Sequence, residues 1–270
     1  MGRGSEKMAR IQIREVSHPE RYLGARAVEA HHVANALSKL PRVYSPREQI
    51  LNTAFGMAFD HIISEWNREI LKGKNPSVEY LSSLFMGAFI DSAKEGLIQY
   101  VLRHKRDPRE TVITQEEYET YFHKGKKMLK AFQQTPAFGK PRPDVRVVLV
   151  NEKYGFVARG DFIDPERKVL YEVKTTTHHH SYPRAYWQVL MYLLAYPEVE
   201  SAAIVYFESV GDTYRPQLRV ITRDELDEYA VEKIRKKVVE LAEKRGKFIS
   251  PSTLASWKIL EIPSLPDIPT

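Results

Sequence analysis

Two carboxylates and one lysine stand in the second half of the sequence in an order that suits metal-dependent chemistry. Asp161 is followed, after ten residues, by the triplet Glu172-Val173-Lys174. If the triplet lies on a strand, Glu172 and Lys174 are two apart and project from the same face. Two carboxylates that face one point make the hard oxygen site that Mg²⁺ or Mn²⁺ prefers. The neighbouring ammonium can orient a water molecule or neutralise charge developing on a phosphate.

The local sequence predicts a β-hairpin that positions these groups. Residues 154–163 are strand-like, 164–168 carry turn chemistry and 169–175 are again rich in strand formers. Asp161 can then reach the point that the second strand faces. Asp164 is the rival first carboxylate, but its Asp-Pro context favours a turn, so Asp161 is preferred. The ordinary alternative is an exposed pair of carboxylates offset by Lys174 across the hairpin surface.

A polar pair follows on the next predicted helix, at 183–195. Gln188 and Tyr192 are four residues apart and share one helix face. A glutamine beside an aromatic residue is common on amphipathic helices. The position of Gln188, fourteen residues after Lys174, is what links the pair to the candidate site.

Taken together, Asp161, Glu172-Val173-Lys174 and the Gln-x-x-x-Tyr helix resemble the PD-(D/E)XK nuclease superfamily, in its RecB-like and Cas4-like branch. The resemblance implies an α/β fold, with a mixed central sheet flanked by helices as a restriction-endonuclease-like core, here with a helical N-terminal elaboration. It implies a metal-dependent DNA nuclease that uses one or two Mg²⁺ or Mn²⁺ ions, most simply an exonuclease on DNA ends or single strands in recombination, repair or replication. The alternative is a catalytically silent or partner-dependent DNA-binding subunit of a larger DNA-processing complex.

The same resemblance assigns roles to the residues of the pattern. Asp161, Glu172 and the backbone carbonyl of Val173 would bind the metal, and Lys174 would orient the nucleophile or stabilise the charge of the transition state. Gln188 and Tyr192 would support Lys174 and the catalytic strand; the full set carried over as catalytic is Asp161, Glu172, Lys174, Gln188 and Tyr192.

An upstream metal ligand is expected on the predicted helix at 46–71, where the family often places a histidine four residues after a glycine. Here His61 stands five residues after Gly56, and Asp60 occupies the four-residue spacing. His61 is the preferred ligand because imidazole is the commoner choice, and Asp60 remains open. The simpler alternative is an ordinary helix face with a polar residue at its edge.

Positive charge favours a polyanionic partner. The chain carries a formal net charge of +6, which attracts nucleic acid, and basic residues cluster at 103–106 and 124–127. Histidines 178–180 lie in the predicted loop between strand and helix, and three consecutive side chains cannot all point one way. The residues predicted to contact nucleic acid are Tyr182, Arg184, Lys126, Lys127 and His179.

The 270 residues include no cysteine. Disulfides, thiolate zinc sites and cysteine-ligated iron–sulfur clusters are therefore excluded. Many Cas4-like nucleases hold such a cluster with four cysteines, so this chain departs from that pattern. No apolar run approaches a membrane span and no signal peptide is recognisable, which predicts a cytoplasmic protein without membrane contact.

The order of predicted elements favours one domain with an elaborated front half. Residues 1–18 are expected to be flexible or extended, and 19–261 to form a single nuclease domain, helical over about 19–140 and α/β over about 141–248. Residues 262–270 are Pro-rich, an extended tail that could engage a protein partner. The predicted helices span 26–40, 46–71, 78–103, 114–134, 183–195 and 224–244, and the predicted strands 146–151, 155–163, 169–175, 202–208 and 217–221.

Overall fold

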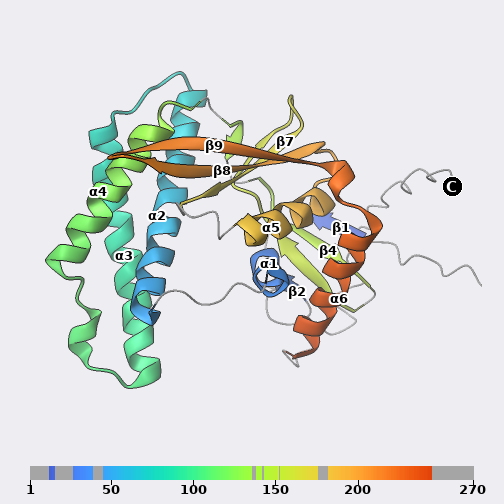
Figure 1. Ribbon diagram of the computed structural model, residues 1–270, viewed down its shortest axis with the longest axis horizontal. Helices are drawn as coiled ribbons and strands as arrows, with labels where there is room; N and C mark the ends of the chain where they lie inside the picture. The colour runs from blue at the N-terminus through green and yellow to red at the C-terminus, as the bar shows by residue number, and fades with distance from the viewer. Residues whose placement is uncertain are drawn as a thin grey trace, which may run out of the picture.

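The computed structural model describes residues 12–15, 27–38, 45–135, 138–141, 143–151, 153–175 and 182–244. In this part of the chain, helices pack around two mixed β-sheets (Figure 1). The α/β class expected from the sequence is therefore confirmed. The helices are α1 (Ala30–Ser38), α2 (Pro46–Leu71), α3 (Val78–His104), α4 (Gln115–Phe132), α5 (Tyr182–Ala195) and α6 (Glu228–Lys244).

The larger sheet has five strands in the order β3-β6-β7-β8-β9. Strands β7 and β8 are parallel and are joined through α5, whereas the other neighbours in this sheet are antiparallel. The parallel pair brings the ends of β7 and the start of α5 to the same edge of the sheet. The strands are β3 (Lys140–Pro141), β6 (Phe162–Asp164), β7 (Val169–Lys174), β8 (Ser201–Val210) and β9 (Thr213–Thr222).

The smaller sheet has four strands in the order β1-β4-β5-β2. Strand β2 pairs parallel to β5, and the other two pairs are antiparallel. Its edge strand β1 comes from the segment 1–18, of which only four residues are described. The strands are β1 (Gln12–Glu15), β2 (Ala27–Glu29), β4 (Arg146–Leu149) and β5 (Gly155–Ala158).

The expectation of one continuous strand over 155–163 is wrong. The chain leaves the smaller sheet after Ala158 and joins the larger one at Phe162. Gly160 lies in this break, packed so closely that an added Cβ would stand 2.7 Å from the Leu170 side chain. Glycine is needed at this close approach, and the break allows two successive strand segments to serve two sheets.

Helices α2, α3 and α4 cover one face of the five-stranded sheet, at the left of Figure 1. The core between them is rich in phenylalanine: the ring centroids of Phe59 and Phe207 are 5.4 Å apart, and those of Phe132 and Phe138 are 5.5 Å apart. From β7, Tyr171 and Val173 point into this core. Such rings bury large apolar areas, so this face is held together by aromatic packing.

Helix α5 covers the opposite face, α1 packs against α5, and α6 packs against α1 and the smaller sheet. Leu170 and Ile204 of the sheet pack there against Val189, Leu190 and Leu193 of α5. Alternate residues of β7 therefore serve two different cores, as the two-residue period of a strand requires.

The helix boundaries agree with local signals in the sequence. Ser45 with Glu48 caps α2 and Thr114 with Glu117 caps α4, each through a reciprocal capping box. Arg47, two residues into this capped start, donates to Glu117 at 2.7 Å and so ties α2 to α4. None of the described helices combines the length and apolar character that a membrane span needs.

Two predicted helices begin later than expected. The helix predicted at 26–40 begins at Ala30, because 27–29 form β2 on β5, and the one predicted at 224–244 begins at Glu228 after a 3-10 turn over Arg223–Glu225. The tail 262–270 lies outside the described residues.

Candidate functional site

The β6–β7 hairpin forms as predicted, and its turn explains what Asp164 does. The Asp164 carboxylate accepts hydrogen bonds from the backbone N–H groups of Glu166 (3.1 Å) and Arg167 (3.0 Å). Lys168 then closes the turn with a positive φ of 52°. Asp164 is thus used in building the turn.

Asp161 lies one residue before β6, opposite Glu172 of β7. Its backbone N–H donates to the Tyr171 carbonyl (3.2 Å), and its carboxylate accepts from the Val173 N–H (2.7 Å). Because the N–H and C=O of one strand residue point to the same side, the Val173 carbonyl also faces the Asp161 side. The backbone therefore holds the Asp161 carboxylate and the Val173 carbonyl beside Glu172.

A chain of polar contacts runs from β7 into α5. The Lys174 ammonium donates to Glu172 Oε1 and, at 2.9 Å, to Gln188 Oε1. The Gln188 amide in turn donates to the Tyr192 hydroxyl. Glu172, Gln188 and Tyr192 are buried, and Lys174 is largely so. The structure thus brings together all five residues of the sequence pattern.

The electrostatics of this site are unusual for a group of carboxylates. Burial, then the charges of Glu172 and Asp60, raise the pKa of Asp161 well above its ordinary value, against the opposing effect of Lys174. Glu172 Oε2 is buried and has no hydrogen-bond partner among the described residues. An excess of buried negative charge with an unpartnered oxygen leaves room for a cation.

On α2, it is Asp60 whose charge acts on Asp161. The α2 face that carries Gly56 lies against the end of β7, since an added Cβ on Gly56 would stand 3.5 Å from Thr175 Oγ1. Asp60 follows one helical turn later on this face, whereas His61 is exposed. Of the two candidates for an upstream ligand, Asp60 is therefore the one that lies on the α2 face toward Asp161.

The residues predicted to contact nucleic acid fall into two groups. Tyr182 and Arg184 lie at the start of α5, near the end of β7, and Arg184 contacts Asn35 of α1 at 3.5 Å. Lys126 and Lys127 lie on α4, at the other face of the sheet, where Lys127 forms an ion pair with Asp212 of the β8–β9 turn. His179 lies outside the described residues.

An extended set of rings and cations continues from Tyr182. The Arg219 guanidinium stacks 3.7 Å from the centre of the Tyr182 ring, and Lys233 stands 4.6 Å above Trp187. Tyr206, in register with Lys174 across β7 and β8, lies 6.5 Å from Tyr182. We call this set the aromatic–cation surface; its members are Tyr182, Tyr186, Trp187, Tyr206, Arg219, Tyr229 and Lys233.

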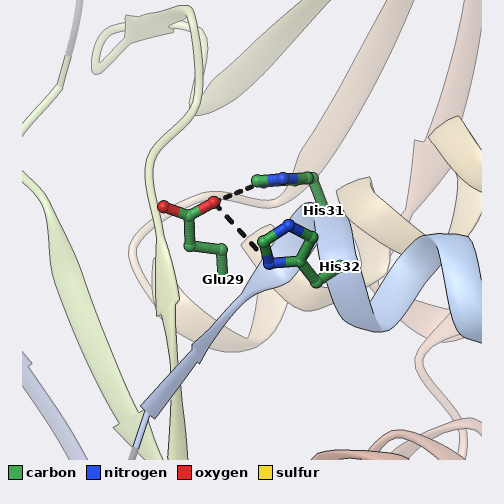
Figure 2. Close-up of side chains that lie close together, drawn as sticks. All are labelled: Glu29, His31 and His32. Atoms are coloured by element: carbon green, nitrogen blue, oxygen red, sulfur yellow. Dashed lines mark ion pairs between the residues drawn. The ribbon is translucent and has the colours of Figure 1, made fainter. Parts of the chain in front are cut away.

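A second group of potential ligands lies at the junction of β2 and α1 and was not predicted from the sequence. Glu29 ends β2, and His31 and His32 belong to the first turn of α1; both rings turn toward the Glu29 carboxylate (Figure 2). The His31 Nδ1 and His32 Nδ1 atoms lie 2.9 and 3.9 Å from Glu29 Oε2. The two adjacent histidines could have indicated this group. It was missed because a helix was expected over 26–40, whereas 27–29 form the strand that brings Glu29 to the histidines.

This group lies within electrostatic reach of the first site. Partial burial, then His32, lowers the pKa of His31 to about 4 against the effect of Glu29, and the charges of Lys174 and Arg184 lower it further. The His31 imidazole is therefore neutral at neutral pH. The two groups of ligands are therefore close enough for Lys174 to act on His31.

Comparison with known proteins adds no relative to this description. The sequence matches no protein-family model and no curated protein, and no solved structure matches the chain.

Proposed function

We propose that the chain is a metal-dependent DNA nuclease of the PD-(D/E)XK type. The observation that supports this most directly is the assembly of Asp161 and Lys174 around the buried Glu172, whose Oε2 has no hydrogen-bond partner in the described part of the chain. Purely structural ion pairs satisfy their buried oxygens, because an unpartnered buried carboxylate oxygen costs free energy. A site that binds a cation in its working state has a reason to leave one oxygen open.

The types of donor atom suit a hard divalent cation: Asp161, Glu172 and Asp60 carry carboxylate oxygens, the ligands that Mg²⁺ and Mn²⁺ prefer, and the Val173 carbonyl faces the same side. Among the described residues only Glu29, His31 and His32 bring three ligand atoms within 4.8 Å of one another, so the three carboxylates would have to draw together around an ion. Burial, then the charges of Glu172 and Asp60, raise the pKa of Asp161, and a bound cation would offset those neighbouring charges. These residues would hold the ion, which supplies Lewis-acid polarisation of a phosphate oxygen and of an attacking water.

The protein's own part in hydrolysis follows from the contacts of Lys174. Glu172 and Gln188 fix the ammonium from two sides, so it is held in one orientation. An ammonium fixed in this way can hold a water molecule by hydrogen bonding and can stabilise negative charge on a phosphate oxygen. Gln188 accepts from Lys174 and donates to Tyr192, so the pair sets the direction of the lysine without itself ionising.

The aromatic–cation surface supports single-stranded nucleic acid as the substrate. Its tyrosines and tryptophan offer ring faces and edges to unpaired bases, and Arg219 and Lys233 offer charge to phosphates. Tyr206 connects this surface to Lys174 across one pair of strands. A strand that follows the surface would pass the carboxylates, which favours action on single strands or frayed ends.

The test is cleavage of end-labelled linear single-stranded and double-stranded DNA, beside closed circular DNA, in Mg²⁺, Mn²⁺ or EDTA. We expect metal-dependent loss of the linear substrates. Sparing of the circles would define an exonuclease, and cutting of the circles an endonuclease. Lys174→Ala should remove either activity, and Lys94→Ala, at an exposed lysine on α3, is the matched control.

Two results would contradict the proposal. The first is cleavage that persists in EDTA or in Lys174→Ala, which would place the chemistry elsewhere or in a contaminant. The second is metal-independent DNA binding with no cleavage product under any of these conditions, which would favour the silent or partner-dependent DNA-binding subunit.

A further inference from the structure

We propose that Glu29, His31 and His32 form a second metal site, one that takes a borderline divalent transition-metal ion, Zn²⁺ above all. The inference concerns a set of ligands that the proposed nuclease chemistry does not use. It stands independently of whether the chain cleaves DNA.

The geometry of the group carries this proposal. One ligand atom from each of the three residues lies within 4.8 Å of the other two. In a tetrahedral zinc site with bonds of about 2.0–2.1 Å, ligand atoms stand about 3.4 Å apart. The His31–Glu29 and His32–Glu29 separations of 2.9 and 3.9 Å bracket that value, so small side-chain rotations suffice.

The backbone holds the three residues together before any ion binds. Glu29 is fixed by the pairing of β2 with β5, and the histidines by the first turn of α1 directly after that strand. The imidazole rings lie 4.0 Å apart, tilted by 47°, with both Nδ1 atoms toward one carboxylate oxygen (Figure 2). A strand-to-helix junction thus supplies a largely preorganised ligand set.

The types of donor atom favour one class of metal ion. Two imidazole nitrogens and one carboxylate oxygen are the donor set of open zinc sites, which keep a fourth position for water or another ligand. Imidazole suits Zn²⁺, whereas carboxylates and carbonyls suit Mg²⁺ and Mn²⁺. The group therefore differs in kind from the all-oxygen ligands around Asp161, although His31 lies within reach of the Lys174 charge.

An imidazole binds a metal ion through the ring nitrogen that carries no proton. His31 and His32 would therefore bind through Nδ1 in the tautomer that carries its proton on Nε2. His31 Nδ1 lies 2.9 Å from Glu29 Oε2, and the Glu29 carboxylate would offset one of the two positive charges of the ion.

The experiment is a calorimetric titration of the metal-free full chain with Zn²⁺, with Co²⁺ absorption as a spectroscopic report of nitrogen and oxygen ligation. We expect a Zn²⁺ site that is lost, with at least about a tenfold fall in affinity, in His31→Ala and in Glu29→Gln. Saturation at a hundred times Kd should raise Tm by about 5–10 °C. His123→Ala, an exposed histidine on α4, is the matched control.

Two further variants separate this site from its neighbours. Zn²⁺ binding should persist in the double variant Asp161→Asn, Glu172→Gln, and in the variant with alanine at 178–180. The inference is overturned if Zn²⁺ still binds after His31→Ala and His32→Ala. It is equally overturned if Zn²⁺ binding is lost only in the double variant Asp161→Asn, Glu172→Gln or in the variant with alanine at 178–180. Zn²⁺ binding without DNA cleavage would defeat the proposed nuclease function alone. Circular dichroism of every variant checks that the fold is retained.

Discussion

The two faces of the five-stranded sheet solve different problems with the same strand. On the face covered by α2, α3 and α4, β7 contributes Tyr171 and Val173 to an apolar, aromatic core. On the face covered by α5, it contributes Leu170 to a second core and then Glu172 and Lys174 to a buried polar chain. The first face is packed mainly with apolar and aromatic side chains, whereas the second gives up apolar packing at one end to hold charge.

The difference shows where the fold tolerates unfavourable electrostatics. An apolar core gains free energy from each ring it buries. A buried cluster of carboxylates with a single lysine does not, because desolvation and like-charge repulsion oppose it. The aromatic face therefore supplies stability, and the α5 face uses part of it for the candidate site.

The largest expected effect comes from Glu172→Gln. The substitution keeps the shape of the side chain but removes the negative charge that faces Lys174 and the proposed cation. We expect cleavage to fall by about 10²–10³-fold or more, with Tm of the metal-free protein unchanged or raised. Single-turnover cleavage and thermal melts measure the two effects. A large fall in Tm would instead make Glu172 a structural residue.

The opposite face should respond in the opposite way. Phe132 contacts Phe59, Trp66, Phe138 and Phe207 in the aromatic core. Phe132→Ala should cost about 3–5 kcal/mol of unfolding free energy. Chemical denaturation measures the loss, and cleavage per folded molecule should stay near that of the unchanged protein. A large fall in cleavage per folded molecule would show that packing on the aromatic face affects the site on the α5 face.

The third prediction concerns pH. Because burial, Glu172 and Asp60 raise the pKa of Asp161, the native state holds this proton more tightly than the unfolded chain does. Stability of the metal-free protein from this group is full at acidic pH and falls as pH rises from the ordinary carboxyl range through the raised pKa. Asp161→Asn should remove that fall, raising Tm at pH 8 more than at pH 5.

Saturating Mg²⁺ should reduce the difference in Tm between Asp161→Asn and the unchanged protein at pH 8, because a bound cation offsets the negative charge of Asp161. An equal Tm difference between Asp161→Asn and the unchanged protein at both pH values would mean that Asp161 is not the group that opposes folding. The measurement is a set of thermal melts over pH with EDTA or Mg²⁺.

The smallest effect is expected at Lys124, a cation within the aromatic face. Burial lowers its pKa to about 8, and its ammonium stands 4.4 Å from the centre of the Phe55 ring. The charged form therefore costs stability below about pH 8, and stability rises as pH increases from there toward the unfolded value. Lys124→Met should gain about 1 kcal/mol at pH 7, a gain that shrinks toward pH 10. Denaturation at the two pH values measures it.

Much of the fold was legible in the local sequence. The 26-residue helix α2 has the predicted limits, because Ser45, Pro46 and Glu48 form a capped start. The turn at Asp164 and the strand after it were legible for the same reason, since turn chemistry and strand alternation are short-range. The break at Gly160 was not, because the choice between two sheets depends on partners far along the chain.

The candidate site divides in the same way. That Glu172 and Lys174 share a strand face, and Gln188 and Tyr192 a helix face, follows from backbone periods of two and 3.6 residues, so local sequence predicts both. That Asp60, about 100 residues earlier, acts on Asp161, and that Glu29 meets His31 and His32 near Lys174, depends on how distant segments pack. Those contacts arise from how α1 and α2 pack against the sheet, and packing between distant segments leaves no period in the sequence to read.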